Sequence, residues 1–337
     1  MRSYTRENSA LNKITRLLLL VVLLLSAAKL YAVERDVVVE CHWGELYATL
    51  SMPDVATDTA VLIVAGSGPT DRNGNSSLNL VTYSYKMLSD ALVERGIAVM
   101  RYDKRGIGQS SIAPELIPNL LFDDYVDDAE ACVNRLRAEG YRRVIIAGHS
   151  EGGLIAMCVA DRGNVELDGL VLLAAAGYPI DEVLARQLAA QLMPTHVGLM
   201  LRATNIQQRL KRGERVDEQD IPRELLSVYH PTVQPFLINQ MQYDPRELAS
   251  RCKLPVLIVT GGRDIQVSTD NGEVLDRRFE RSSHINFADM SHVLKDATTS
   301  DRMEQLVSVY TNSQLPLTEG LADAVAGFVL CGNDEAK

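Results

Sequence analysis

The stretch Val144–Gly153 reads VIIAGHSEGG and contains a serine in the pattern G-x-S-x-G. A short apolar run precedes this pattern, and small and apolar residues typical of a helix follow it. A strand, a tight turn and a helix in this order raise a serine hydroxyl above the edge of a sheet. The glycines let the strand and the helix approach each other, because glycine has no Cβ atom. The pattern predicts that Ser150 is a nucleophile. The alternative interpretation is a solvated serine in a glycine-rich turn.

Two further residues could activate Ser150. A serine hydroxyl is a weak nucleophile at neutral pH, so a neutral imidazole has to accept its proton and a carboxylate has to orient that imidazole. Asp264 and His292 each lie just beyond the carboxyl end of a predicted strand. Because the carboxyl ends of parallel strands meet at one edge of a sheet, we expect Ser150, Asp264 and His292 to form a triad. Asp289 is the alternative acid, but it precedes His292 so closely that it is badly placed to reach the far ring nitrogen.

The carbonyl oxygen of a substrate becomes negatively charged when a serine attacks it, and two main-chain N–H groups can stabilise that charge. We predict Glu151 as one donor, because it follows the nucleophile at the start of the predicted helix, where N–H groups are free. We expect the other donor in the loop Gly66–Asn75 (GSGPTDRNGN), which follows the apolar run AVLIVA. Ser67 is the first choice and Gly68 is the second.

The elements that could position these residues alternate along the chain. Apolar runs predict buried strands at Ala60–Ala65, Val144–Ala147, Leu170–Ala175 and Val256–Thr260. Two further strands are predicted at Ile97–Tyr102 and His284–Ala288. Helices are predicted at Lys86–Arg95, Asp123–Arg137, Gly153–Ala160, Asp270–Phe279 and Glu319–Leu330, and a β-hairpin at Val37–Ser51. The alternation predicts an α/β fold with a parallel sheet. Pro179–Arg251 has no convincing strand, so we predict an insertion of several short helices that forms a cap above the sheet.

Two arginines lie in predicted loops and could bind a substrate carboxylate. Arg72 belongs to the glycine-rich loop, and Arg105 belongs to Asp103–Ser110 (DKRGIGQS). We favour a structural interpretation for both. In this interpretation an ion pair between Asp103 and Arg105 orders the second loop.

The first 32 residues have the layout of a targeting segment. Basic residues precede an uninterrupted apolar run at Leu17–Leu25, and small residues follow it. This layout is typical of a signal peptide, and the apolar stretch is shorter than the roughly 20 residues that span a bilayer. We predict a signal peptide at 1–32 and export to the periplasm or the medium, without stable membrane association after cleavage. The alternative is a membrane anchor formed by an uncleaved signal.

Composition narrows the possible partners. The net charge of −10 argues against a nucleic-acid-binding protein. Export would place the cysteines in an oxidising compartment. Their wide spacing shows no metal-type cluster, and their odd number leaves at least one thiol unpaired in a monomer. We interpret Cys132 and Cys158 as buried free thiols, and sequence does not choose a pair among the others, which are Cys41, Cys252 and Cys331.

Several segments together resemble the α/β-hydrolase superfamily, and in particular bacterial serine carboxylesterases with a GSGPTDRNGN-type oxyanion loop. They are Gly66–Asn75, Asp103–Ser110, Gly148–Gly153, Gly262–Val267 and Met290–Lys295. The resemblance runs from about Val37 to Leu330. It implies a mostly parallel eight-stranded sheet flanked by helices, with a core at 33–177 and 252–337 and a helical cap at 178–251, inserted after strand 6. It also implies catalysis without a metal or cofactor.

We therefore expect a serine hydrolase that cleaves carboxylic esters through a Ser-His-Asp triad and an acyl-enzyme. Its partner would be a small-molecule ester. Short acyl chains are expected, because no long apolar stretch in the predicted cap indicates a lipid-facing lid. Thioesterase, lactonase, acyltransferase and cofactor-free haloperoxidase activities are alternatives on the same triad. A non-catalytic ligand-binding protein is a further alternative. The sequence indicates no oligomeric state.

Overall fold

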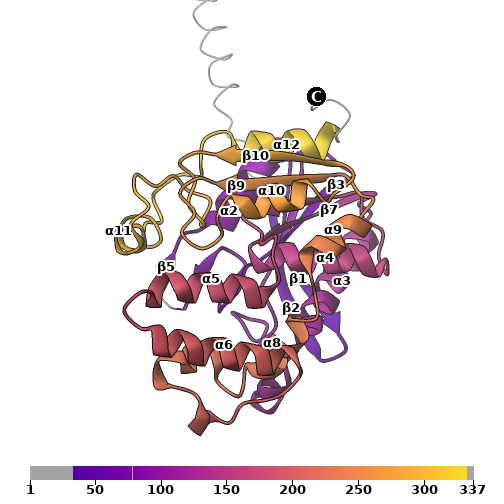
Figure 1. The fold of residues 1–337 in the computed structure, drawn as a ribbon. Helices are drawn as coiled ribbons and strands as arrows, with labels where there is room; N and C mark the ends of the chain where they lie inside the picture. Colours follow the sequence, from indigo (N-terminus) through magenta and orange to yellow (C-terminus); the bar gives the residue numbers. More distant parts are fainter. Residues whose placement is uncertain (1–32, 78, 332–337) are drawn as a thin grey trace, which may run out of the picture.

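A computed structural model of the chain describes residues 33–77 and 79–331. The predicted signal peptide at 1–32 lies outside the described residues. Eight strands form one sheet in the order β1-β2-β6-β3-β7-β8-β9-β10 (Figure 1). Their bounds are Val33–Cys41, Gly44–Met52, Ala98–Tyr102, Thr59–Val64, Arg143–His149, Gly169–Leu173, Val256–Gly261 and Ser282–Phe287 in that order. β2 is antiparallel to both neighbours and the other pairs are parallel, so the predicted mostly parallel sheet is confirmed.

The central strands are buried because helices cover both faces of the sheet. β3, β6, β8 and β9 consist of buried residues along their whole length, as continuous apolar runs in a parallel sheet require. One face packs against α2 (Ser84–Val93) and α12 (Leu321–Cys331). The other packs against α3 (Phe122–Ala138), α4 (Glu151–Arg162), α9 (Pro245–Arg251) and α10 (Asp270–Asp276). The loops that follow the parallel strands lie at the carboxyl edge of the sheet.

The segment between β8 and β9 is helical. Before α9 it contains α5 (Ile180–Leu192), α6 (Val197–Lys211), α7 (Leu226–Tyr229) and α8 (Gln234–Gln240). These four helices share an apolar cluster that is separate from the two clusters of the sheet. Figure 1 shows α5, α6 and α8 together beyond one end of the sheet. We refer to residues 178–251 as the helical insertion.

Several short elements were not predicted. β4 (Asn75–Ser76) and β5 (Leu80–Val81) form a two-stranded sheet. A 3₁₀ helix spans Pro114–Asn119, and α11 spans Arg302–Ser308. Each is too short to show a periodic apolar pattern. The first hairpin was predicted, but β1 begins at Val33, ahead of the predicted start.

The five cysteines are free thiols. Cys132 and Cys158 are buried, Cys41 and Cys252 are half-buried, and Cys331 is exposed. Burial raises the pKa of the Cys132 and Cys158 thiols, which makes them poor nucleophiles. In the described part of the chain, no helix has both the length and the apolar character needed to cross a bilayer.

Candidate active site

Ser150 lies in a tight turn between β7 and α4. Its φ of 54° and ψ of −119° lie outside the regions that L-residues favour, so the turn is strained. Its N–H donates to the carbonyl oxygen of Leu173 (2.8 Å), which ties the turn to β8. The flanking glycines are required by close packing. A Cβ at Gly148 would lie 2.2 Å from the carbonyl oxygen of Gly152, and a Cβ at Gly152 would lie 2.2 Å from that of Val64.

The structure brings the three predicted triad residues together. Nε2 of His292 lies 3.1 Å from Oγ of Ser150, and Nδ1 of His292 lies 2.8 Å from Oδ2 of Asp264. The residues come from the loops that follow β7, β9 and β10. The side chains of His292 and Asp264 are 6% and 0% exposed, so bulk water hardly competes for these bonds. Such a chain can move a proton from the hydroxyl to the imidazole.

The carboxylate of Asp264 is fixed from both sides. Its Oδ1 accepts the main-chain N–H groups of Gln266 (2.7 Å) and Val267 (2.9 Å), while Oδ2 contacts His292. Because Nδ1 of a neutral His292 donates to this carboxylate, Nε2 is left as the acceptor that faces Ser150. The rival acid, Asp289, lies beside Arg263 instead, with 3.6 Å between Oδ1 and Nε.

The predicted oxyanion donors border the same space as Ser150. Glu151 is the first residue of α4, so its N–H has no acceptor within the helix. Ser67 and Gly68 follow β3, and both line the two cavities that contact Ser150. The loop is packed against the serine, because a Cβ at Gly66 would lie 3.1 Å from Cβ of Ser150. The choice of Ser67 over Gly68 stays a prediction.

No sequence pattern indicates a role for His149, the residue before the serine. Its buried ring faces the carbonyl oxygen of His292 through Nε2 (2.7 Å) and the Tyr85 hydroxyl through Nδ1 (2.8 Å). A carbonyl only accepts, so Nε2 carries the proton and Nδ1 accepts from Tyr85. The Tyr85 oxygen in turn accepts the N–H of Gly66 (3.1 Å). Burial, followed by the nearby His292, lowers the pKa of His149 to about 3, so its ring is neutral at neutral pH.

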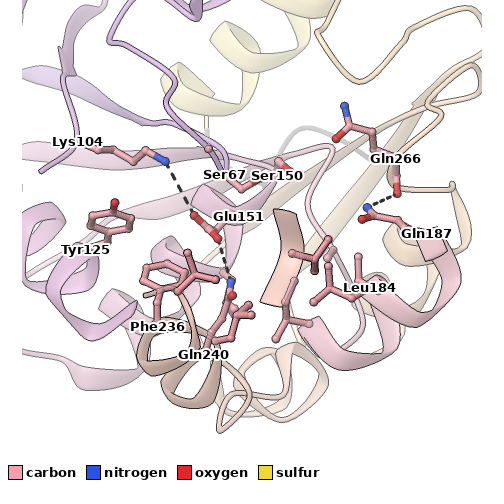
Figure 2. A pocket seen from close by; sticks show the side chains of 18 of the residues that line it. Ser67, Lys104, Tyr125, Ser150, Glu151, Leu184, Gln187, Phe236, Gln240 and Gln266 are labelled. Atoms are coloured by element: carbon pink, nitrogen blue, oxygen red, sulfur yellow. Dashed lines mark hydrogen bonds and ion pairs between the residues drawn. The ribbon is translucent and has the colours of Figure 1, made fainter. Parts of the chain in front are cut away.

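A buried ion pair lies in the wall of the site, as Figure 2 shows. Nζ of Lys104 lies 4.0 Å from Oε1 of Glu151 and donates to the carbonyl oxygen of Gly66. Oε2 of Glu151 accepts from Nε2 of Gln240 in α8 (3.1 Å). Burial raises the pKa of Glu151 and lowers that of Lys104, and each charge opposes the shift of the other. The residue after the serine therefore joins the core to the helical insertion, which no sequence pattern indicated.

The predicted ion pair between Asp103 and Arg105 is wrong. Asp103 accepts the N–H of Arg72 (2.8 Å), and its Oδ2 lies 3.5 Å from Nε of Arg72. Arg105 binds the buried Asp128 through Nε (3.0 Å) and Nη2 (2.7 Å). The chain turns at Arg105, which directs the two side chains to different neighbours. Both arginines hold loops in place, in line with the structural interpretation of these residues.

Two cavities meet at Ser150. The larger, about 500 Å³, lies between the core and the helical insertion, and its walls are mostly apolar side chains such as Leu154, Leu184 and Phe236. The smaller, about 270 Å³, is lined by His292 and by several residues that carry hydroxyl groups, namely Thr70, Ser76, Thr82, Ser84, Tyr85 and Tyr310. Four residues line both cavities, namely Ser67, Gly68, Ser150 and Gln266. The serine can therefore be reached from two sides. Among the described residues, no group of three or more His, Cys, Asp and Glu side chains is arranged to hold a metal ion.

Comparison with known proteins agrees with this architecture. Residues 81–292, more than half of the chain, match the family described as Serine aminopeptidase, S33. The sheet order and the strand–turn–helix at Ser150 define an α/β-hydrolase fold, and the chain belongs to this family of α/β-hydrolases. Among curated proteins, esterase EstD of Thermotoga maritima is 27% identical over 241 residues, which are 70% of this chain and 54% of EstD. The chain thus spans about half the length of this curated relative.

Solved structures show the same fold at lower identity. The Pyrococcus furiosus esterase Pf2001 superposes with a TM-score of 0.54 at 16% identity, covering 88% of this chain and 92% of that one. Est1E from Butyrivibrio proteoclasticus superposes with a TM-score of 0.53 at 17% identity, covering 88% and 97%. These structures share the fold, while the activity of this chain has to be argued from its own site.

Proposed function

We propose that this protein hydrolyses carboxylic esters, with Ser150 as the nucleophile, His292 as the general base and acid, and Asp264 as the carboxylate that orients His292. The observation that carries the proposal is the continuous chain from Ser150 Oγ to Asp264 through His292, with contacts of 3.1 and 2.8 Å. The similarity to an esterase from Thermotoga maritima supports an ester as the substrate.

The reaction follows from the geometry of these atoms. Oγ of Ser150 attacks the ester carbonyl carbon while its proton passes to Nε2 of His292. The N–H groups of Glu151 and Ser67 stabilise the oxyanion that forms. When the tetrahedral species collapses, the bond to the alcohol oxygen breaks and His292 returns the proton to that oxygen. Water, deprotonated by His292, then attacks the acyl carbon. The bond from that carbon to Oγ of Ser150 breaks, His292 returns the proton to Oγ, and the acid is released.

The two cavities divide the substrate between them. The alcohol oxygen has to take its proton from Nε2 of His292, so the alcohol part lies on the side of that residue. His292 lines the smaller cavity and not the larger one. The smaller, hydroxyl-lined cavity therefore receives the alcohol, and the larger, apolar cavity receives the acyl group.

Acyl length is the finer part of the proposal. The sequence of the helical insertion has no long apolar stretch typical of a lipid-facing lid, which predicts short acyl chains. A volume of about 500 Å³ falls in the range of cavities that hold drug-sized ligands, so the cavity alone does not limit the substrate to short chains. The short-chain preference stays a prediction, and initial rates across acyl lengths measure it.

The name of the matched family raises the alternative of an aminopeptidase. Such an enzyme needs an anion to bind the α-ammonium group of its substrate. Among the described residues that line the two cavities, Glu151 is the one carboxylate, and it already contacts Lys104 and Gln240. This engagement favours an ester over a peptide with a free N-terminus. Rates on aminoacyl p-nitroanilides provide the direct comparison.

The test of the proposal is hydrolysis of p-nitrophenyl esters of increasing acyl length by the wild-type protein and by Ser150→Ala. We expect turnover by the wild type and a loss of up to about 10⁶-fold in kcat in the variant, as for comparable triads. A fluorophosphonate should label the wild type and not the variant. Absence of both turnover and labelling would favour a ligand-binding protein. Product formed with an added alcohol at the expense of hydrolysis would favour an acyltransferase.

We also propose that the protein is exported and that its signal peptide is removed. The proposal rests on the basic, apolar and small-residue order of 1–32. N-terminal sequencing of the mature protein tests it. A start near residue 29 or 33 is expected from the small residues at Ala28 and Ala32, whereas an intact Met1 would favour a membrane anchor.

A further inference from the structure

One peptide group of the site connects a bound carbonyl oxygen with a predicted oxyanion donor. The carbonyl oxygen of Gly66 and the N–H of Ser67 belong to the same peptide unit. This unit is trans, because the structure has its one cis bond within the described residues elsewhere, before Pro194. In a planar trans peptide the C=O and N–H bonds point in opposite directions. A group that binds the Gly66 carbonyl oxygen therefore also decides where the Ser67 N–H points.

Lys104 is the group that binds this oxygen. Its ammonium donates a hydrogen bond to the Gly66 carbonyl oxygen, and the residue is only 1% exposed. The other surroundings of Nζ are the ring of Tyr125, whose centroid is 5.2 Å away, and Oε1 of Glu151 at 4.0 Å. A desolvated ammonium forms stronger hydrogen bonds than one in water. The contact with Gly66 is thus a strong and directional one.

We infer that Lys104 is a positioning residue for the oxyanion hole, which holds the Gly66–Ser67 peptide so that the Ser67 N–H faces the oxygen of the substrate carbonyl. The inference rests on the proposed ester hydrolysis. It deepens that proposal by naming the side chain that orients one of the two donors. It also gives a role to the lysine that is buried beside the serine.

The other contacts of Gly66 do not fix the orientation of the peptide plane between Gly66 and Ser67. The N–H of Gly66 is held by the Tyr85 hydroxyl, and Gly66 itself packs against His149 and Ser150. Glycine has no Cβ to restrict its ψ angle, so the plane that follows Gly66 can rotate unless something binds its oxygen. Lys104 supplies that contact. Its positive charge also polarises the peptide, which makes the Ser67 N–H a better donor.

The simpler interpretation is that Lys104 only neutralises the buried charge of Glu151. Two variants separate the two roles. Lys104→Met removes the ammonium and leaves Glu151 without its cation. Lys104→Met combined with Glu151→Gln removes both charges and keeps an amide that can still contact Gln240. If neutralisation were the whole role, the double variant would regain activity.

The measurements are kcat, KM and inhibition by a trifluoromethyl ketone, which forms an oxyanion when Ser150 adds to it. In both variants we expect kcat to fall by about 10² to 10³-fold, as when one oxyanion donor is lost, with a much smaller change in KM. Affinity for the ketone should fall by a similar factor. The double variant should be more stable than the single one, because it no longer buries the unpaired carboxylate of Glu151. It should be equally slow, because the ammonium that binds the Gly66 oxygen is still missing.

A matched control is Lys295→Met. Lys295 is also fully buried, and its Nζ donates to the main-chain carbonyl oxygen of Asn312 (3.0 Å) and not to that of Gly66. This variant should lose stability and keep the ratio of ketone affinity to substrate affinity. Wild-type kcat in the double variant would overturn the inference, as would unchanged ketone affinity in either Lys104 variant.

Failure of the proposed function gives a different result. In that case the wild type itself would hydrolyse no ester and would not react with a fluorophosphonate, and the inference would fall with it. An active, labelled wild type together with active Lys104 variants would overturn the inference alone.

Discussion

The ring of His149 donates a hydrogen bond to the main-chain carbonyl oxygen of His292, with 2.7 Å between nitrogen and oxygen. The residue that precedes the serine in sequence therefore holds the backbone of the proposed general base. The same ring contacts Tyr85, which binds Gly66 of the oxyanion loop. Three loops that are distant in the chain are thus joined through one neutral imidazole.

This network predicts how stability depends on pH. The pKa of His149 is about 3 in the folded protein, below its ordinary value of 6.5. Between these values the unfolded chain binds a proton that the folded chain does not, so stability falls as pH falls below 6.5. The slope from this one group reaches about 1.4 kcal/mol per pH unit. The free energy of unfolding, measured with urea between pH 7.5 and 5, should change less with pH in His149→Gln than in the wild type. Equal slopes in the two proteins would contradict the prediction.

The two candidate acids give a second prediction. Asp264→Asn keeps the shape of the side chain but leaves His292 without its carboxylate and in the wrong tautomer, so kcat should drop by about 10⁴-fold. Asp289→Asn removes a carboxylate that contacts Arg263 near the surface and should leave kcat close to that of the wild type. Steady-state rates on one ester decide between them. A larger loss in the Asp289 variant would show that the acid has been assigned incorrectly.

The close packing of the turn gives a third prediction. A Cβ at Gly152 would lie 2.2 Å from the main-chain oxygen of Val64 and 2.9 Å from that of Ala65. Main-chain atoms cannot rotate away, so Gly152→Ala should destabilise the fold by about 1–3 kcal/mol or more. It should also lower kcat, because Val64 and Ala65 lead into the oxyanion loop.

The control for this substitution is Gly198 in α6, where an added Cβ meets nothing within 4 Å. Gly198→Ala should be neutral or stabilise the protein by up to about 1 kcal/mol through helix propensity. Thermal melts of both variants test the pair. Equal melting temperatures of the two variants would contradict the prediction, because they would mean that the turn can accommodate a Cβ at Gly152.

The fourth prediction concerns Arg105, which is 5% exposed and bound to Asp128 by two hydrogen bonds. Arg105→Met leaves the carboxylate buried without its cation, which costs about 3–5 kcal/mol in comparable pairs. Because Arg105 is engaged in the loop, KM for the folded enzyme should not change. Adding Asp128→Leu should restore part of the stability. A raised KM for acidic esters would instead support substrate binding by this arginine.

The positions around Ser150 could be predicted from sequence because one rule governs them. Ser150, Asp264 and His292 each follow a predicted strand, and the carboxyl ends of parallel strands meet at one edge. The contacts of Lys104 and His149 could not be predicted in this way. They depend on which loops face each other across the sheet, and hydrophobic periodicity carries no information about that.

Other differences have local causes. Glu34, Arg35 and Asp36 belong to β1 because they pair with β2. They are exposed at the sheet edge, so they show no apolar alternation from which a strand could be predicted. α11 was missed because it is short and largely exposed, although Asp301 caps the N–H of Glu304, and the D-x-x-E spacing is a helix-start signal. Asp103 and Arg105 are close in sequence but do not pair, because the chain turns at Arg105 and the two side chains contact different neighbours, Arg72 and Asp128.

The hydrogen bond between Gln240 and Glu151 limits how the helical insertion could be exchanged. A chimaera that grafted a foreign insertion between β8 and β9 would also remove the donor that contacts the residue next to the nucleophile. Glu151 would then keep Lys104 as its partner but lose its contact with α8. Transplanting specificity by this route thus requires a side-chain amide, or another donor, at the place that Gln240 occupies. Without it, a grafted insertion changes the nucleophile's surroundings together with the substrate pocket.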